Sequence, residues 1–288
     1  MGDAIAQALL SWLRLVASST LAPALDAAGQ LIFQTPAFDQ IPEVSSTWRL
    51  VRGLADGLVV VAILAVGLLV MSSGTLETTY TVKRLVPRLV LAILLSNTSL
   101  AICGALIRLD NAVVIALVGS SPGATAWSGV TKAFSGGNVP TDVLLSLVAI
   151  AAAVLAVLLV VVYLARDLVL LLLTVLAPLA LLAQSLPILD ELARLWWRGY
   201  CALLFLQVAH AVLVTLGAKL LTNTAWLGTP ASSLITGLVV VTLLYLMVKL
   251  PFIAYRWAFQ QRVSSSPVVE IVQLARKTAA TVAAVVAR

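Results

Sequence analysis

Residues 175–182 read VLAPLALL, and residues 195–200 read LWWRGY. A proline stands in the middle of an almost unbroken apolar run, and two tryptophans and an arginine follow before the sequence turns apolar again. The hydrophobic core of a soluble protein does not require a proline and paired tryptophans within an apolar run. In membrane proteins, prolines are frequent in spanning helices and tryptophans gather at the interfaces. The stretch therefore predicts a membrane protein.

The composition of the whole chain supports this prediction. Of the 288 residues, 61% are hydrophobic and only 10% are charged, whereas a soluble domain has about 25% charged residues. The mean hydropathy is +1.09. A net charge of +6 suggests nucleic-acid binding in a soluble protein, but basic residues also collect on the cytoplasmic loops of membrane proteins. We expect an all-α fold, a polytopic helical membrane protein.

Apolar segments of the right length follow one another along the chain. A spanning helix needs about 20 predominantly apolar residues, and five segments meet this requirement: 52–72, 88–107, 142–165, 200–221 and 233–254. A sixth segment, 168–186, is apolar but contains Pro178. The sequence therefore predicts five to six transmembrane helices.

Three regions follow from this pattern. Residues 1–49 are an amphipathic helix, interrupted near Pro23, and a linker on the non-cytoplasmic side; the helix lies in the interface or packs on other helices. Residues 50–256 are the transmembrane core, with a long outer loop at 108–141 that is rich in Gly, Ser and Pro. Residues 257–288 are a basic tail, cytoplasmic by the positive-inside bias, that ends in an amphipathic helix.

The segment around Pro178 leaves two alternatives open. If residues 168–186 cross the membrane fully, the basic tail falls on the wrong side. A proline-broken, re-entrant element returns the chain to the cytoplasmic side, and we favour it over a kinked full crossing. Arg166 and Asp167, which precede this segment, form either a tight cytoplasmic turn or a self-neutralised pair.

Several polar or aromatic side chains in the core are candidates for function. Trp196 and Trp197 fit an interfacial aromatic belt, and Arg198 complements the dipole of the helix that carries it. Asp56, inside a GxxxG pattern that predicts close helix packing, is expected to pair with Arg49 or Arg52. His210 serves either a proton pathway or a hydrogen bond between helices, and we favour the hydrogen bond.

No motif for catalysis is found. The phosphate-binding pattern GxxxxGK[ST] is absent, so the chain is not expected to use ATP itself. One histidine and two distant cysteines do not make a metal site. The sequence therefore predicts no enzyme activity, no cofactor and no metal.

The order of features from residue 142 to 221 resembles the TrbL family, the polytopic membrane subunit of type IV secretion and conjugation machines. A long apolar hairpin is followed by LAPL at 176–179, a break at Leu186-Pro187, a helix that ends in Trp197 and a further span. The acidic stretch before the tryptophans departs from the family pattern. The resemblance implies a homo-oligomeric ring in the cytoplasmic membrane, a translocation channel for DNA or protein, a role in pilus assembly, and separate ATPase subunits.

The resemblance also points to two working parts. The outer loop around Trp127 would meet the substrate or pilin, and the element from Pro178 to Trp197 would shape the channel or the subunit interface. Two alternative functions stay open. A secondary transporter needs inverted repeats and polar sites at mid-membrane, which are not evident here, and a non-conducting scaffold predicts no loop exposed to a transported substrate.

Overall fold

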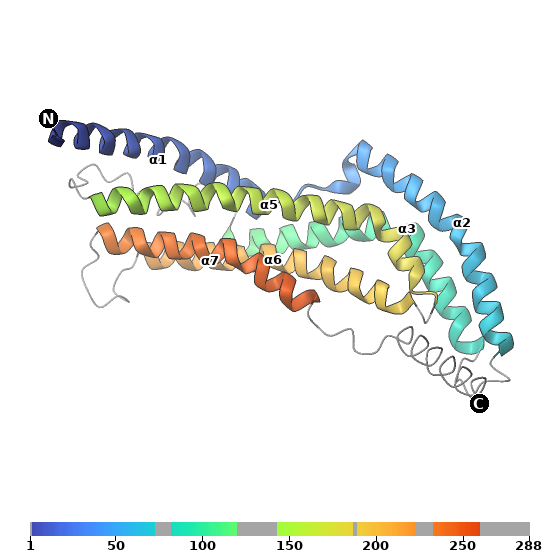
Figure 1. The fold of residues 1–288 in the computed structure, drawn as a ribbon. Coiled ribbons are helices and arrows are strands. Elements are labelled where there is room, and N and C mark those ends of the chain that lie inside the picture. The colour runs from blue at the N-terminus through green and yellow to red at the C-terminus, as the bar shows by residue number, and fades with distance from the viewer. Residues whose placement is uncertain (1, 73–81, 120–142, 187–188, 223–232, 260–288) are drawn as a thin grey trace, which may run out of the picture. The chain divides into compact units, whose positions relative to one another are not determined.

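The computed structural model describes residues 2–72, 82–119, 143–186, 189–222 and 233–259, and within these ranges every regular element is helical (Figure 1). The elements are α1 (Gly2–Phe33), a short 3-10 helix η1 (Phe38–Gln40), α2 (Pro42–Ser72), α3 (Val82–Val118), α5 (Val143–Ala183), α6 (Asp190–Thr222) and α7 (Ser233–Phe259). The predicted all-α class is confirmed.

Four helices in the described part of the chain are long and apolar enough to cross a membrane. They lie at Leu85–Val118, Ser146–Ala183, Asp190–Leu221 and Leu234–Arg256. The chain is therefore a polytopic, multi-pass membrane protein, as the composition indicated. The first predicted span, 52–72, falls in α2, which is not among these four and some of whose side chains lie outside the described part; that span stays a prediction.

The structure differs most from the sequence prediction in the region around Pro178. Residues 143–183 form one helix of 41 residues, with Pro178 inside it. No turn occurs at Arg166-Asp167, and the predicted re-entrant break is wrong, since the two segments predicted as 142–165 and 168–186 are continuous. The charges at 166–167 looked like a turn because they interrupt an apolar run, but both side chains are buried and bonded to each other.

Other helices are also longer than predicted. α3 continues through residues 108–118, which were assigned to the outer loop, and α1 runs through Pro23 without interruption. α6 begins at Asp190, so the residues that carry Trp196 and Trp197 belong to the same helix as the predicted span 200–221. Only residues 34–41 of the predicted linker separate α1 from α2, because α2 begins at Pro42, a residue well suited to a first helical position. Residues 120–142 of the loop and 260–288 of the tail lie outside the described residues.

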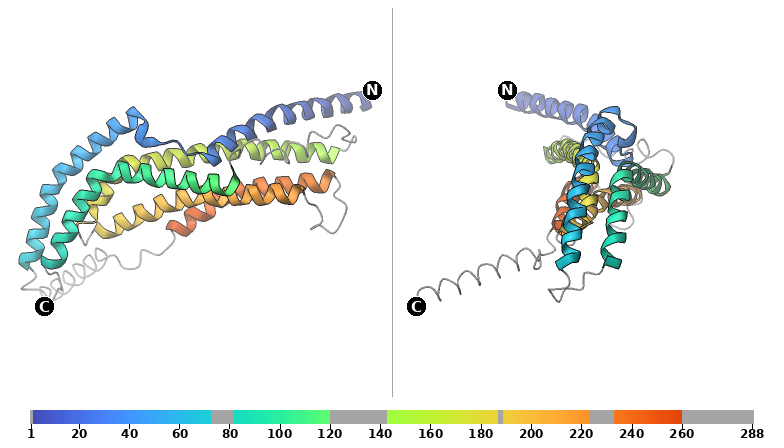
Figure 2. Two further views of the ribbon diagram at one scale, coloured as in Figure 1. Left: turned by 180° about the vertical axis from the view of Figure 1, so that it is seen from behind. Right: turned by 90° about the vertical axis from the view of Figure 1, so that its right-hand side faces the viewer.

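The chain divides into two units. Unit 1 holds residues 1–37, 104–171 and 201–255, and unit 2 holds residues 38–103, 172–200 and 256–288. The core of unit 1 gathers side chains from five helices, with Leu25 of α1, Val114 of α3, Leu159 of α5, Ala211 of α6 and Leu244 of α7 fully buried or nearly so. Within it, α5, α6 and α7 run side by side (Figure 2). Small residues on α5 allow this close packing in an apolar environment.

In unit 2, single side-chain hydrogen bonds join the helices in pairs. Trp48 Nε1 of α2 donates to Ser99 Oγ of α3 at 2.9 Å. Tyr200 Oη of α6 donates to the carbonyl of Cys103 on α3 at 3.3 Å. Asp190, at the start of α6, binds both Arg88 of α3 and Arg194 one turn further on. Such bonds are a usual means of holding membrane helices together.

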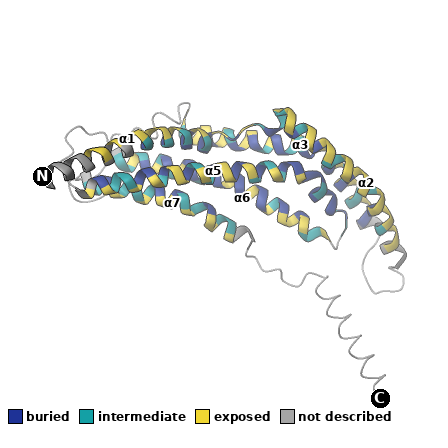
Figure 3. Ribbon diagram, turned by 45° about the horizontal axis from the view of Figure 1, so that its top comes forward, coloured by how far each residue is buried: buried dark blue, intermediate teal, exposed yellow. Residues whose placement is uncertain are grey.

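Apolar side chains also cover the outside of the helices. Buried and exposed residues alternate along each helix (Figure 3), and exposed positions on α5 include Leu144, Val154, Leu164 and Leu172. Faces of this kind on a soluble protein mark an interaction site or an aggregation hazard. On these helices they are suited to lipid or to neighbouring apolar protein.

One glycine in unit 1 lies at a tight contact between two helices. A Cβ atom at Gly217 of α6 would lie 2.0 Å from Leu243 Cδ1 and 3.3 Å from Leu243 Cγ of α7. We expect Gly217→Val to lower the unfolding free energy by about 1–3 kcal/mol, the usual result of overpacking a tight contact. The loss is measured as a lower midpoint of thermal unfolding in detergent.

The control is Gly57→Val in α2. A Cβ at Gly57, or at Gly53, meets nothing within 4 Å, so the close packing predicted at this GxxxG pattern is not found among the residues that the structure describes. Both variants change helix propensity alike. Equal losses for the two variants would show that the α6–α7 contact tolerates the added volume.

Candidate functional site

A cluster of buried polar side chains lies in unit 1 around Arg166. We call it the Arg166 centre; its members are Thr35, Asp110, Asn111, Arg166, Asp167 and Gln207. They come from the connection after α1, from α3, from α5 and from α6. Arg166 is only 2% exposed. A charged group buried among apolar helices is costly unless it is fully paired.

The guanidinium group of Arg166 uses all of its hydrogen-bond donors. Its Nε and Nη2 both donate to the carbonyl of Leu203, at 3.2 and 3.0 Å. Nη2 also donates to Gln207 Oε1 at 3.0 Å. Nη1 donates to Thr35 Oγ1 at 2.6 Å and to Asp167 Oδ1 at 2.8 Å. Since arginine has five N–H groups, none is left without an acceptor.

The centre also supports the backbone where the chain leaves α1. Thr35 is 1% exposed and not helical, and Pro36 after it has no N–H to donate. The side-chain amide of Asn111 accepts from the Thr35 N–H at 3.0 Å and donates to the Thr35 carbonyl at 2.9 Å. Backbone outside a helix needs such partners wherever water is excluded. Asn111 therefore replaces the helical bonds that Thr35 lacks.

Gln207 completes the network. Its Nε2 donates to Asn111 Oδ1 at 3.0 Å, and its Oε1 accepts from Thr35 Oγ1 as well as from Arg166. The same amide therefore connects α6 to α3, to α5 and to the segment after α1. A network of this kind is stable only when every member is paired.

Asp110 is the member with the weakest contact. Its Oδ2 lies 3.8 Å from Arg166 Nη2 and has no hydrogen-bond partner among the described residues. The Arg166–Asp167 pair already balances one positive and one negative charge. The centre therefore holds one carboxyl group more than its guanidinium neutralises.

His210 lies in the same unit, on α6. It is fully buried, and its ring meets the ring of Tyr163 edge-on at 5.3 Å between centroids. Its Nε2 lies 2.8 Å from the carbonyl of Met247 on α7. The predicted hydrogen bond between helices is confirmed.

Pro178 and Trp196 are both buried in unit 2. Pro178 has no N–H, so the carbonyl of Thr174 loses its helical partner. The carbonyl of Leu173, one residue before, accepts from Trp196 Nε1 at 2.9 Å, and the Pro178 carbonyl accepts from Ser96 Oγ at 2.9 Å. Trp196 is 7% exposed. It therefore holds α6 against α5 and does not serve as the interfacial anchor that we predicted.

The other predicted site residues lie elsewhere. Trp197 is half-buried and meets Trp196 edge-on at 5.0 Å, and Arg198 is exposed. Asp56 lies 3.7 Å from Arg52, one of its two predicted partners, and is exposed. Trp127 lies outside the described residues.

Most residues of the Arg166 centre were not predicted from the sequence. Thr35, Asp110, Asn111 and Gln207 were not selected, although each is polar and lies within or beside an apolar run. A polar residue in an apolar run is the sequence feature that could have identified them. This feature does not show which distant residues contact one another, and Asp110 and Asn111 were assigned to the start of a loop.

The chemistry of the Arg166 centre is that of a structural and charge-bearing site. It contains paired donors and acceptors but no nucleophile next to a base. Among the residues that the structure describes, no three His, Cys, Asp or Glu side chains gather into a group that could hold a metal ion. The centre is suited to fixing four segments of the chain and to holding charge among apolar helices.

We expect Arg166→Gln to destabilise the protein strongly. Removing one partner of a buried ion pair leaves the other charge unpaired and costs about 3–5 kcal/mol. The thermal midpoint in detergent should fall clearly, while Arg198→Gln, at an exposed position, should leave it nearly unchanged. An unaltered melting curve for Arg166→Gln would contradict the stabilising role of the centre.

The whole sequence also matches a known protein family. A family model described as "TrbL/VirB6 plasmid conjugal transfer like protein" matches residues 1–288, the whole chain. No curated protein and no solved structure matches the chain significantly. The family groups membrane components of conjugal transfer and type IV secretion and is not a known enzyme family. The chain belongs to the TrbL/VirB6 family of plasmid conjugal transfer-like proteins.

Proposed function

We propose that this membrane component forms part of the translocation channel of a conjugation machine in the cytoplasmic membrane. The observation that carries the proposal is the family match over residues 1–288. The four apolar helices and their exposed apolar faces support it, because a channel subunit must pack in lipid and against other subunits. The transported substrate is DNA or protein, and the same subunit contributes to the site of pilus assembly.

The proposal includes partners. Separate ATPase subunits supply energy, pilin contacts the outer side, and copies of this chain assemble as a homo-oligomeric ring. The segment around Trp127 is proposed to meet the substrate or pilin. These assignments rest on the kind of machine to which the family belongs and on the sequence pattern.

The residues proposed for function differ in burial. Exposed ones can contact a substrate or a neighbouring subunit, and buried ones support the fold. Pro178 and Trp196 are enclosed in unit 2 and bonded to neighbouring helices. Arg198, on the same helix as Trp196, is exposed. We therefore assign the contact with substrate or with a neighbouring subunit to Arg198 and Trp197, and the support of that surface to Pro178 and Trp196.

DNA transfer from a donor strain that lacks this gene tests the assignment. The wild-type gene should restore transfer. Arg198→Ala should reduce the restored transfer by about tenfold, the effect of losing roughly 1.4 kcal/mol of interaction. Arg49→Ala, at an exposed position on α2, is the matched control and should restore transfer fully. Membrane levels of both variants are measured by immunoblotting. Equal transfer by the two variants would remove Arg198 from the contact surface.

A second measurement separates a channel from its alternatives. Formaldehyde is applied to donors during transfer, the chain is precipitated, and the transferred DNA strand is quantified. A channel subunit should recover this strand above the level found with an unrelated membrane protein. Recovery of partner subunits without DNA would favour a non-conducting scaffold. Normal transfer in the deletion strain would favour a separate role such as secondary transport.

A further inference from the structure

The single histidine of the chain has an unusual pair of neighbours. His210 is fully buried on α6. Its Nδ1 lies 2.9 Å from the carbonyl oxygen of Leu206, and its Nε2 lies 2.8 Å from the carbonyl oxygen of Met247 on α7. Both ring nitrogens thus face backbone carbonyl groups at hydrogen-bond distance.

Carbonyl oxygens accept hydrogen bonds and cannot donate them. A neutral imidazole has one N–H donor and one nitrogen lone pair. In the neutral ring, one lone pair would point at a carbonyl oxygen without a hydrogen between them, which is repulsive. Only the imidazolium form, with hydrogen on both nitrogens, satisfies both contacts. The geometry therefore indicates a positively charged His210.

The buried charges of unit 1 support this form. Arg166 pairs with Asp167 at 2.8 Å, which leaves the charge of Asp110 without a full counterpart. A net charge buried among membrane helices is costly. With a protonated His210, the buried ionised groups that the structure describes in unit 1 are two cations and two anions. Their charges sum to zero.

Tyr163 links the two charged regions. Its ring meets the His210 ring edge-on at 5.3 Å, and the guanidinium carbon of Arg166 lies 6.0 Å from the centre of the same ring. All three side chains are buried in unit 1. His210 and the Arg166 centre are therefore close enough, through one aromatic ring, to respond to each other's charge.

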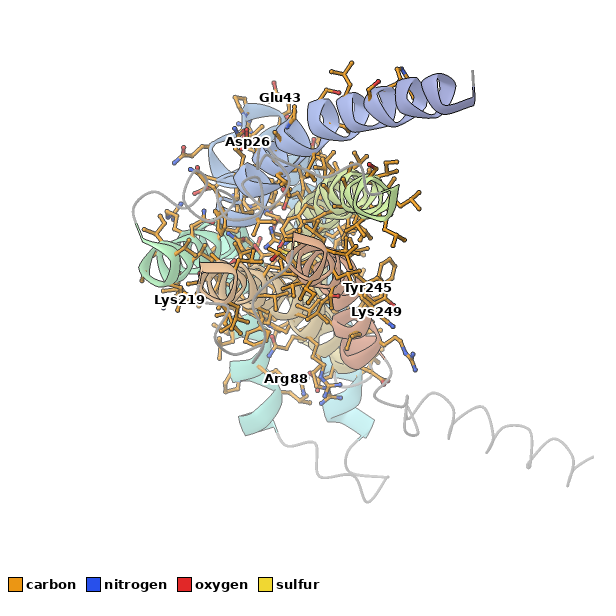
Figure 4. All side chains as sticks on the ribbon, turned by 90° about the vertical axis from the view of Figure 1, so that its left-hand side faces the viewer. Asp26, Glu43, Arg88, Lys219, Tyr245 and Lys249 are labelled. Carbon is orange, nitrogen blue, oxygen red and sulfur yellow. The ribbon has the colours of Figure 1, made fainter. Side chains whose placement is uncertain are left out.

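The remaining titratable side chains that the structure describes in unit 1 are exposed or half-buried. Lys249 of α7 donates to Tyr245 Oη at 3.0 Å, and both side chains are exposed (Figure 4). The exposed ones are Asp26, Arg108, Cys201, Lys219, Tyr245 and Lys249, and Tyr255 is half-buried. The buried charged groups that the structure describes in unit 1, besides His210, are thus Arg166, Asp167 and Asp110.

We propose that His210 is a proton-binding site in the membrane-embedded part of the protein. With the proton bound, the imidazolium donates one hydrogen bond to the Leu206 carbonyl on its own helix and one to the Met247 carbonyl on α7. Asp110 is the anion that balances it. Loss of the proton removes one of the two bonds and leaves the charge of Asp110 unbalanced within unit 1. The inference does not depend on the proposed channel function.

The test uses the full-length chain in lipid bilayers with nitrogen-15 label in histidine alone. Because the chain has one histidine, the spectrum reports a single residue, provided that purification uses a tag without histidine. At about pH 7.5, where an ordinary histidine is mostly neutral, we expect both ring nitrogens to carry a directly bonded hydrogen. A spectrum with one protonated and one bare nitrogen overturns the proposal, and a proton held by Asp110 gives this same result.

A pair of variants tests the balancing role of Asp110. Asp110→Asn removes the buried anion, so His210 should lose its second hydrogen at the same pH. Asp56→Asn removes an exposed carboxylate on α2 and should leave both hydrogens in place. A doubly protonated His210 in Asp110→Asn would overturn the charge balance. The wild-type spectrum needs neither variant and decides the proton site alone.

Discussion

The hydrogen bonds of the Arg166 guanidinium are the interaction on which unit 1 depends. An arginine buried among apolar helices must find an acceptor for each of its N–H groups. Here the acceptors come from three segments, which are the connection after α1, the next residue on α5, and two positions on α6. Asp110 of α3 lies nearby. Satisfying one charge therefore fixes the mutual positions of the helices that meet in this unit.

Among the residues that the structure describes, the helices of unit 2 are held together by separate hydrogen bonds and not by one connected network. Its helices are joined by separate bonds such as Trp48 to Ser99, Ser96 to Pro178 and Trp196 to Leu173. Each such bond in a membrane protein is worth about 0.6 kcal/mol on average, so the loss of one leaves the rest in place. In the Arg166 centre, the loss of one member leaves a buried charge or donor unpaired, which makes its members interdependent.

The sequence was sufficient for the class of fold and for contacts along one helix or between obvious partners. Apolar segment lengths predicted a polytopic helical protein, and the α7 span, the Arg52–Asp56 pair and the helix-bridging His210 were correctly predicted. The rule that charges face water failed at Arg166-Asp167 and at Asp110. There, charged groups are solvated by side chains far away in sequence, and no local pattern identifies which residues meet.

Chain order has a consequence for how α5 enters the membrane. Synthesis proceeds from the N-terminus, so Thr35, Asp110 and Asn111 are made before Arg166, and Gln207 follows in the next helix. Alone in lipid, each charge in the middle of α5 would oppose insertion by about 2.5–3.5 kcal/mol. Partners that are already inserted reduce this barrier. Insertion of α5 and assembly of the polar network are thus coupled during biogenesis, and a change at Thr35 or Asn111 acts on a helix made much later.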